Sequence, residues 1–329
     1  MRNGFLLCLN VSLGVFLPSS MLAAKDETVR IVFAGDIMLD CLPGEDIAKG
    51  KDPFADFAEL LDGADLSIGN LECVVATSGK AVAKPWTFRA RPEVLKTLGK
   101  HFHVVSLANN HTGDFGHDAF LEQLGLLQKS KIGYFGGGKD IIEARVPLVV
   151  ERKGIRIALL GYNEFQPREF EAGPTWPGVA WAVEEQMIAD IQNARTKLKA
   201  DVVIPYLHWG WEEYAKPNRG QKKLARALLD AGADMVVGAH PHIVQGAEIY
   251  NNKPIVYSLG NCVFDGFTTK KLRIGWFLSL DVTKTGVQRW HTVPLLLDER
   301  GTPRRMPDLA TPSGEKDDPK VHLRIGALR

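Results

Sequence analysis

Two spacings of apolar residues alternate along this chain. Short β-branched runs, such as residues 29–34 and 202–206, have the pattern of buried strands, while segments such as 117–129 and 184–198 carry apolar residues at helical spacing. Because the two kinds of segment follow one another from Val29 to Leu297, the sequence predicts an α/β fold rather than a helical bundle or an all-β sandwich. Further strands are expected at residues 65–68, 103–107, 131–135, 146–150, 156–161, 235–238, 255–258, 275–282 and 288–297, and further helices at 52–61, 92–98 and 221–230.

The first 24 residues have the pattern of a secretory signal peptide. Arg2 precedes an apolar run at residues 5–17, and small residues follow up to Ala24, before the first acidic side chain. The run is short for a membrane span and contains polar residues. We therefore expect residues 1–24 to be a signal peptide and the protein to be exported, periplasmic or extracellular. It would stay attached to the membrane if the leader is not cleaved.

The rest of the chain indicates one domain. Residues 25–298 show no internal repeat and no linker-like change of composition. Within them, residues 163–181 are rich in Pro, Gly and Trp and are expected to form a long surface loop, a type of segment that is often functional. Residues 299–329 are charged, contain proline and have weak periodicity, which indicates a peripheral C-terminal tail.

The charge balance excludes one class of partner. The sequence has 40 Lys and Arg against 39 Asp and Glu. Arg2 is the one charged residue before Lys25, so the chain from Lys25 onward balances 39 basic against 39 acidic side chains. Nucleic-acid binding is typically accompanied by a basic excess, which this chain lacks, so no nucleic-acid partner is expected.

Side chains that can bind metals stand where five of the predicted strands end. In an open α/β sheet the carboxyl ends of the strands share one edge, where ligand sites form. Without a metal site, the polar residue at each of the five strand ends would need its own structural explanation. The repetition of such residues at five strand ends therefore favours a metal site. The candidate ligands are Asp36, Glu72, Asn110, His208, His240 and His242, with Asn70 and His111 beside them.

The histidine pair at the end of this series has a distinctive context. The apolar run at 235–238 leads into His240-Pro241-His242, and a proline favours an extended conformation for the residue before it. Residues i and i+2 of an extended segment point the same way. The two imidazoles are therefore expected to converge, although a single His-x-His pair in a loop is also a common hydrogen-bonding arrangement.

The donor set narrows the choice of metal. Carboxylate, amide and imidazole ligands without thiolate suit manganese, iron or zinc better than calcium or copper(I), so one or two divalent ions of that group are expected. Two ions about 3.5–4 Å apart can orient a phosphate or carbonyl oxygen and activate a water. His111, next to a candidate ligand, is the candidate catalytic acid for the leaving oxygen.

Six motifs, in chain order, resemble those of the CapA family, the bacterial poly-γ-glutamate capsule synthesis proteins, which belongs to the calcineurin-like metallophosphatase superfamily. The resemblance covers about residues 29–297. It implies a metallophosphatase-like sandwich of two β-sheets flanked by helices, with the metal site between loops at one edge. The motifs are Gly35-Asp36-Ile37-Met38-Leu39, Gly69-Asn70-Leu71-Glu72, Asn109-Asn110-His111-Thr112, His208-Trp209-Gly210-Trp211-Glu212, Gly238-Ala239-His240-Pro241-His242 and Ser258-Leu259-Gly260-Asn261.

The resemblance also implies roles for the candidate residues. Asp36 matches the first aspartate of the superfamily, Glu72 takes the place of the bridging aspartate, and His111 matches the acid. Asn110 matches the ligand asparagine of the superfamily. The three later histidine ligands of the superfamily correspond to His208, His240 and His242. Met38 stands where phosphatases carry a histidine ligand, and a thioether binds hard divalent metals poorly, so one of the two metal positions lacks a usual ligand.

Five further polar residues are candidates for contacts with the substrate or with the ligands. Asn70 lies in the motif of Glu72, and Lys84 and Arg89, near a segment similar to a further family element, would meet carboxylates or phosphates. Glu212 either orients His208 or is a solvated surface carboxylate. Asn261 either braces the loop of His240 or caps a strand end. The five are Asn70, Lys84, Arg89, Glu212 and Asn261.

Three functions agree with these features. The resemblance implies an exported protein that acts in the synthesis, export or anchoring of poly-γ-glutamate or another anionic capsule or envelope polymer, with the capsule synthesis machinery at the membrane as a partner. The second function is a stand-alone metal-dependent phosphoesterase or amide hydrolase that acts on an anionic polymer or a small phosphate-containing substrate. The third is a non-catalytic polymer-binding module that keeps the fold.

Overall fold

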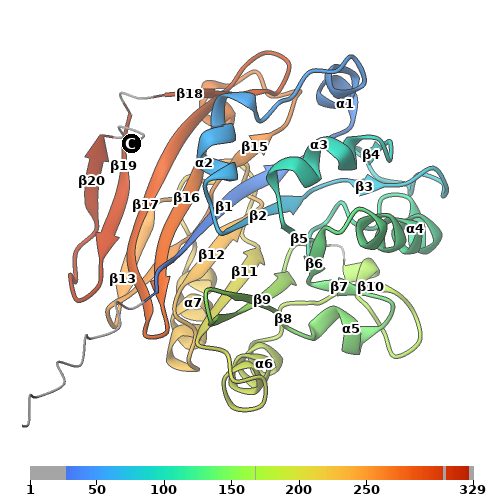
Figure 1. The fold of residues 1–329 in the computed structure, drawn as a ribbon. Helices are drawn as coiled ribbons and strands as arrows, with labels where there is room; N and C mark the ends of the chain where they lie inside the picture. The colour runs from blue at the N-terminus through green and yellow to red at the C-terminus, as the bar shows by residue number, and fades with distance from the viewer. Residues whose placement is uncertain (1–26, 167, 307–308, 326–329) are drawn as a thin grey trace, which may run out of the picture.

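The computed structural model describes residues 27–166, 168–306 and 309–325. Within them two large β-sheets pack face to face, and helices cover the outer face of each sheet (Figure 1). The α/β fold expected from the sequence and the two-sheet sandwich implied by the family resemblance are both confirmed. The signal peptide expected at residues 1–24 lies outside the described residues.

The larger sheet has ten strands and mixes parallel and antiparallel pairing. From β1 through β2 and β5 to β6 the neighbours are parallel, whereas β16 and the strands beyond it pair antiparallel. The order is β20 (His322–Ile325), β19 (Ala310–Glu315), β17 (Gly286–Leu297), β16 (Ile274–Thr283), β1 (Val29–Ile37), β2 (Leu66–Leu71), β5 (Val104–Ser106) and β6 (Gly133–Phe135), with β15 (Asn261–Val263) on β1 and β18 (Pro303–Arg305) on β17. Residues 299–329, expected as a peripheral tail, thus supply three strands at the edge of this sheet.

The smaller sheet has six strands, with four parallel strands at its centre. Its order is β13 (Ala247–Tyr250), β14 (Lys253–Val256), β12 (Val236–Ala239), β11 (Val202–His208), β9 (Ile155–Asn163) and β8 (Leu148–Arg152). The hairpin predicted around residues 153–154 joins β8 to β9. Lys153 and Gly154 have φ values of 48° and 69°, the left-handed conformation that a tight hairpin turn requires.

Alternate residues of the central strands form the core between the sheets. In β1, Ile31 and Phe33 belong to the apolar cluster that both sheets share, whereas Val32 and Ala34 belong to the cluster under the helices. Tyr206 of β11 stacks on Phe33, with ring centroids 6.0 Å apart, and its hydroxyl donates to the carbonyl oxygen of Ala34 at 2.9 Å. This contact ties the two sheets together two residues before Asp36.

The helices form the outer layers of the sandwich (Figure 1). The larger sheet carries α1 (Cys41–Ala48), η1 (Ala55–Phe57), α2 (Ala58–Asp62), α3 (Val94–His101) and α4 (Gly116–Lys129). The smaller sheet carries α5 (Ile141–Arg145), α6 (Glu184–Thr196) and α7 (Arg219–Asp230). Short elements in the connections are β3 (Val74–Val75), β4 (Arg89–Ala90), β7 (Gly137–Gly138), η2 (Arg168–Phe170), β10 (Gly178–Val179) and η3 (Lys270–Arg273). Among the described residues, none of the helices combines the length and apolar character needed to cross a bilayer.

Candidate metal centre

The candidate ligands meet where strands of both sheets end. Asp36 lies near the end of β1 and Glu72 follows β2, both in the larger sheet, whereas His208 is the last residue of β11 in the smaller sheet. The sequence-based expectation of one shared sheet edge is therefore corrected, because each sheet supplies part of the group. The side chains of Asp36, Glu72, His208, His240 and His242 are buried, and Asn110 is half-buried.

One group of ligand atoms comes from Asp36, Glu72 and His242. These three side chains offer one ligand atom each, all within 4.8 Å of one another. The Nδ1 atom of His242 lies 3.4 Å from Oδ2 of Asp36, and its Nε2 atom lies 3.9 Å from Oε1 of Glu72. This spacing suits side chains arranged around a common ion.

A second group comes from Glu72, His208 and His240 and shares the glutamate with the first. Its ligand atoms also lie within 4.8 Å of one another. The Nε2 atom of His208 is 3.4 Å from Oε1 of Glu72, 3.0 Å from Nδ1 of His240 and 2.7 Å from Oδ1 of Asn110. Glu72 is thus the side chain that the two groups share, with Asn110 beside the second group.

Unsatisfied buried atoms show that these residues fit a metal ion. Both carboxylate oxygens of Glu72 and the Nε2 atom of His240 are buried without a hydrogen-bond partner. Burial raises the pKa of Glu72 well above its ordinary value, and the neighbouring Asp36 raises it further. A buried carboxylate in such a place is costly without a positive charge, and a cation between the two groups would supply that charge.

The protonation of the other ligands also suits metal binding. Burial lowers the pKa of His208 to about 3 and the pKa of His240 well below its usual range, so both imidazoles keep a free lone pair at neutral pH. Burial opposes ionisation of Asp36, but its contacts with His242, His208 and Asn70 together lower the pKa of the carboxyl. For His242, burial lowers the pKa of the imidazole, but its contacts with Asp36, Asn261 and Glu212 together raise it. A bound metal would displace that proton.

The backbone of the two-histidine loop differs from the expected extended form. His240 and His242 have φ values of 94° and 55°, in the left-handed region that non-glycine residues seldom adopt. The preference of a residue before proline was therefore overridden by the surrounding contacts. The ring of Phe165 lies against His240, with centroids 3.9 Å apart. Strain of this kind is concentrated at functional sites because the rest of the fold must hold it.

A glycine and two asparagines hold the ligands in place. At Gly238 a Cβ atom would meet the carbonyl oxygen of Tyr257 at 2.1 Å, so glycine is required where β12 leads into the histidine loop. Asn70 donates to Oδ1 of Asp36 at 2.8 Å, and the Oδ1 atom of Asn261 lies 2.8 Å from Nδ1 of His242. Such bonds orient metal ligands and select the imidazole tautomer.

Beside the ligand groups lies an Asp–His pair. The Nδ1 atom of His111 is 2.8 Å from Oδ2 of Asp114, and the ring of Phe88 packs on the imidazole at 4.6 Å. Burial lowers the pKa of His111, although the contact with Asp114 opposes the change. Sequence reasoning did not select Asp114 as a site residue. The signal available was its spacing three residues after His111.

Of the two basic residues predicted to meet the substrate, Lys84 lies beside the candidate site and Arg89 does not. The ammonium group of Lys84 contacts Asp114 and donates to the carbonyl oxygen of Asn110 at 2.9 Å. Arg89 lies apart from the ligands, since its guanidinium donates to the carbonyl oxygens of Ser78 and Gly79 and stacks on Phe115.

Neither Glu212 nor Met38 belongs to the two ligand groups. Glu212 is exposed, in the loop after β11. Met38 is buried in the apolar core under the helices, and its sulfur accepts from the backbone N–H of Asp40 at 3.2 Å. The first ligand group therefore consists of Asp36, Glu72 and His242 without a fourth side chain from this position.

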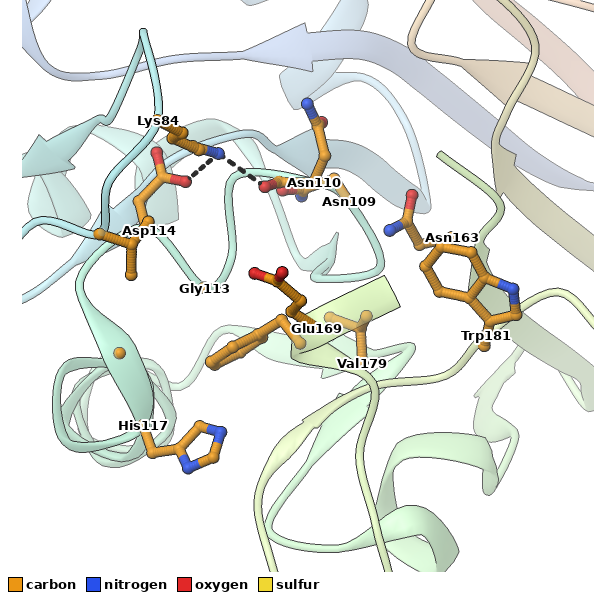
Figure 2. Close-up of a pocket in the computed structure, with 13 residues that line it drawn as sticks. Lys84, Asn109, Asn110, Gly113, Asp114, His117, Asn163, Glu169, Val179 and Trp181 are labelled. Atoms are coloured by element: carbon orange, nitrogen blue, oxygen red, sulfur yellow. Dashed lines mark hydrogen bonds and ion pairs between the residues drawn. The ribbon is translucent and has the colours of Figure 1, made fainter. Parts of the chain in front are cut away.

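A cavity of about 330 Å³ adjoins the ligands (Figure 2). Asn109 and Asn110 form part of its wall, and Asn110 also contacts His208, so the cavity and the ligand groups share a boundary. Residues of the segment expected as a long loop, 163–181, line the other side, among them Asn163, Glu169 and Trp181. That segment therefore takes part in shaping the surroundings of the ligands.

The fold and the buried residues together define a two-sheet α/β protein with a carboxylate–histidine group suited to divalent metals. The chain belongs to the family described as bacterial capsule synthesis protein PGA_cap, whose model matches residues 30–266. The resemblance to the CapA family found in the sequence is thereby confirmed.

Relatives of known name agree with this assignment. The "PGA biosynthesis protein CapA" of Bacillus subtilis is 33% identical over 301 residues, covering 89% of this chain and 76% of its own. The "Capsule biosynthesis protein CapA" of Bacillus anthracis is 30% identical over 289 residues, covering 82% and 70%. Among solved structures, the Haemophilus influenzae NAD nucleotidase (NadN) aligns with a TM-score of 0.47 at 12% identity, covering 86% of this chain and 54% of that chain.

Proposed function

We propose that this chain is an exported protein that acts, through a metal-dependent site, in the synthesis, export or anchoring of poly-γ-glutamate or another anionic envelope polymer. The names of its relatives and the signal-like pattern of residues 1–24 support the proposal. The observation that carries the metal-dependent part is Glu72, whose two buried, unbonded oxygens belong to both ligand groups. The polymer and the capsule synthesis machinery at the membrane are the proposed partners.

Each residue has a definite task in this proposal. Asp36, Glu72 and His242 would hold one ion, and Glu72, Asn110, His208 and His240 a second. Bound manganese, iron or zinc would supply positive charge to polarise a carbonyl or phosphoryl oxygen and to acidify a water. His111, oriented by Asp114, would hold the proton that the leaving group needs.

Metal analysis tests the proposal directly. The mature chain from Lys25, purified without chelator, is compared by elemental mass spectrometry with a His240→Ala/His242→Ala double variant. We expect about one to two equivalents of manganese, iron or zinc in the parent and well under half an equivalent in the variant, because the variant removes a ligand from each group. A parent that stays empty after metal addition would contradict a metal-dependent function.

A second candidate function is that of a stand-alone hydrolase of phosphoesters or amides. The buried His111–Asp114 pair favours it, because a polymer-binding module needs no oriented proton donor beside its metals. A panel of phosphomonoesters, phosphodiesters and γ-glutamyl amides is tested for turnover with the metal-loaded protein. Turnover that His111→Gln abolishes would support the hydrolase, and binding of polymer without turnover would support the non-catalytic module.

A further inference from the structure

The cavity beside the ligands has the size of a small-molecule site. Its volume of about 330 Å³ lies at the lower end of the usual range of roughly 300–1,000 Å³. Asn110 lines it and also contacts His208, so a ligand bound in the cavity would lie next to the metal-ligand group. Figure 2 shows Lys84 and Asp114 on one wall, Trp181 and Asn163 on another, and the carboxylate of Glu169 directed into the space between them.

The charges around the cavity do not cancel. Lys84 is neutralised by Asp114, which it contacts directly, and its ammonium group is further occupied by the carbonyl oxygen of Asn110. Arg168, next to Glu169 in the chain, is held by both carboxylate oxygens of Glu171. Among the residues that the structure describes, no basic side chain pairs with Glu169. Of the two carboxylates that line the cavity, Asp114 and Glu169, only Glu169 therefore lacks a basic partner among the described residues, and His117 is a further titratable side chain of the lining.

The remaining lining is suited to an aliphatic chain with amide groups. Phe170, Val179 and Trp181 provide apolar surface, and Asn109 and Asn163 provide amides. A ligand that fits this lining has a short aliphatic part, hydrogen-bonding amides and a positively charged end opposite Glu169. Carboxylates that have no ammonium group beside them, in contrast, would be repelled by Glu169.

We propose that the cavity binds the free ammonium group at the amino-terminal end of a γ-linked glutamate chain, with Glu169 as its partner. In such a chain every internal nitrogen is an amide, so the ammonium group occurs at this end alone, on the same carbon as one α-carboxylate. The ammonium group would face Glu169, and the α-carboxylate would point away from it. The first γ-amide carbonyl would then lie on the side of Asn110, toward the ligand group. The proposal rests on the proposed function and names the part of the polymer that the protein would bind, its amino-terminal end.

Oligomers that differ at one end test this assignment. A γ-linked glutamate trimer with a free amino terminus and the same trimer acetylated there are titrated into the mature chain, purified with its metal, by calorimetry. Where the protein turns the trimers over, kcat/KM replaces the affinity. We expect the free trimer to bind about fivefold more tightly, the upper range for an ion pair open to solvent.

Variants at Glu169 identify the source of the preference. Glu169→Gln should abolish the difference between the two trimers, and Glu169→Lys should reverse it, whereas the exposed control Glu185→Gln should retain it. Equal affinity of the parent for both trimers would overturn this proposal while leaving the proposed function intact. Failure of the parent to bind either trimer would overturn this proposal and, within the proposed function, the choice of poly-γ-glutamate as the polymer.

Discussion

Glu72 has an environment that makes its charge costly without a metal. It is fully buried, its carboxylate oxygens are unbonded, and Asp36 lies in the same group. Burial and Asp36 both raise its pKa, so the folded protein without metal holds a proton there more tightly than the unfolded chain does. Stability therefore falls as the pH rises above the value for unfolded glutamate, about 4.3.

Replacing this carboxylate should stabilise the metal-free protein. We expect Glu72→Gln to raise the free energy of unfolding by about 1–3 kcal/mol at pH 8 in chelator, with the gain shrinking as the pH approaches 4.3. Urea unfolding at several pH values measures it, with Glu93→Gln as an exposed control. After metal addition the order should reverse, because an amide is a weaker ligand than a carboxylate. A gain that does not depend on pH would contradict the explanation.

At the scale of elements, the loops after the strands decide how the site residues are held. Most strands and their polar ends could be predicted from local pattern, and so could α4, α6 and α7. Helix α1 could not, because Pro43 and Gly44 weaken its helical signal. Its anchor is Arg300, far along the chain, whose guanidinium donates to both carboxylate oxygens of Asp46 at 2.7 and 2.8 Å.

Asp114 illustrates a role that depends on two loops. It follows β5, yet it contacts Lys84 and accepts from the backbone N–H of Phe88 at 2.7 Å, in the loop between β3 and β4, as well as contacting His111. Local sequence contains the spacing from His111 but not the approach of the second loop. Asp114 therefore contacts both His111, the candidate proton donor, and Lys84, which lines the cavity.

Loss of this carboxylate should affect turnover more than metal content. We expect Asp114→Asn to lower kcat on the substrate found in the panel by about 10- to 100-fold, since His111 loses its orienting partner, with unchanged metal stoichiometry. The exposed neighbour Asp118→Asn is the matched control. Steady-state kinetics and elemental analysis provide the two measurements. A parallel loss of metal would show instead that Asp114 acts by holding the ligand loops.

At the scale of the whole molecule, the site depends on the packing of the two sheets. The larger sheet supplies Asp36 and Glu72 and the smaller sheet supplies the histidines, so a shift between the sheets would separate the ligands. The hydroxyl of Tyr206 reaches across the interface to the carbonyl oxygen of Ala34. Both sheets must therefore be in register before the group of ligands exists.

Removing the hydroxyl of Tyr206 should weaken both the fold and the metal site. We expect Tyr206→Phe to lower the free energy of unfolding by about 1–2 kcal/mol and to lower metal affinity as well. Tyr162→Phe is a suitable control, because Tyr162 donates to Asp190 on the outer face of the smaller sheet at 3.0 Å. Urea unfolding and metal titration separate the two effects. Equal metal affinity in parent and Tyr206→Phe would contradict a role in aligning the sheets.

The sequence by itself determined the alternation of strands and helices, the ends of the strands and the ligand types placed there. These features are local, because the spacing of apolar residues and the residues that form turns can be read from neighbouring positions in the sequence. Tertiary structure decided that Glu72 bridges two groups, that His240 and His242 adopt positive φ, and that Arg89 and Met38 lie away from the ligands. Each of these outcomes depends on contacts between segments far apart in the chain, such as the backbone N–H of His240 with Asp36. Such contacts follow from how the two sheets pack, which no local pattern contains.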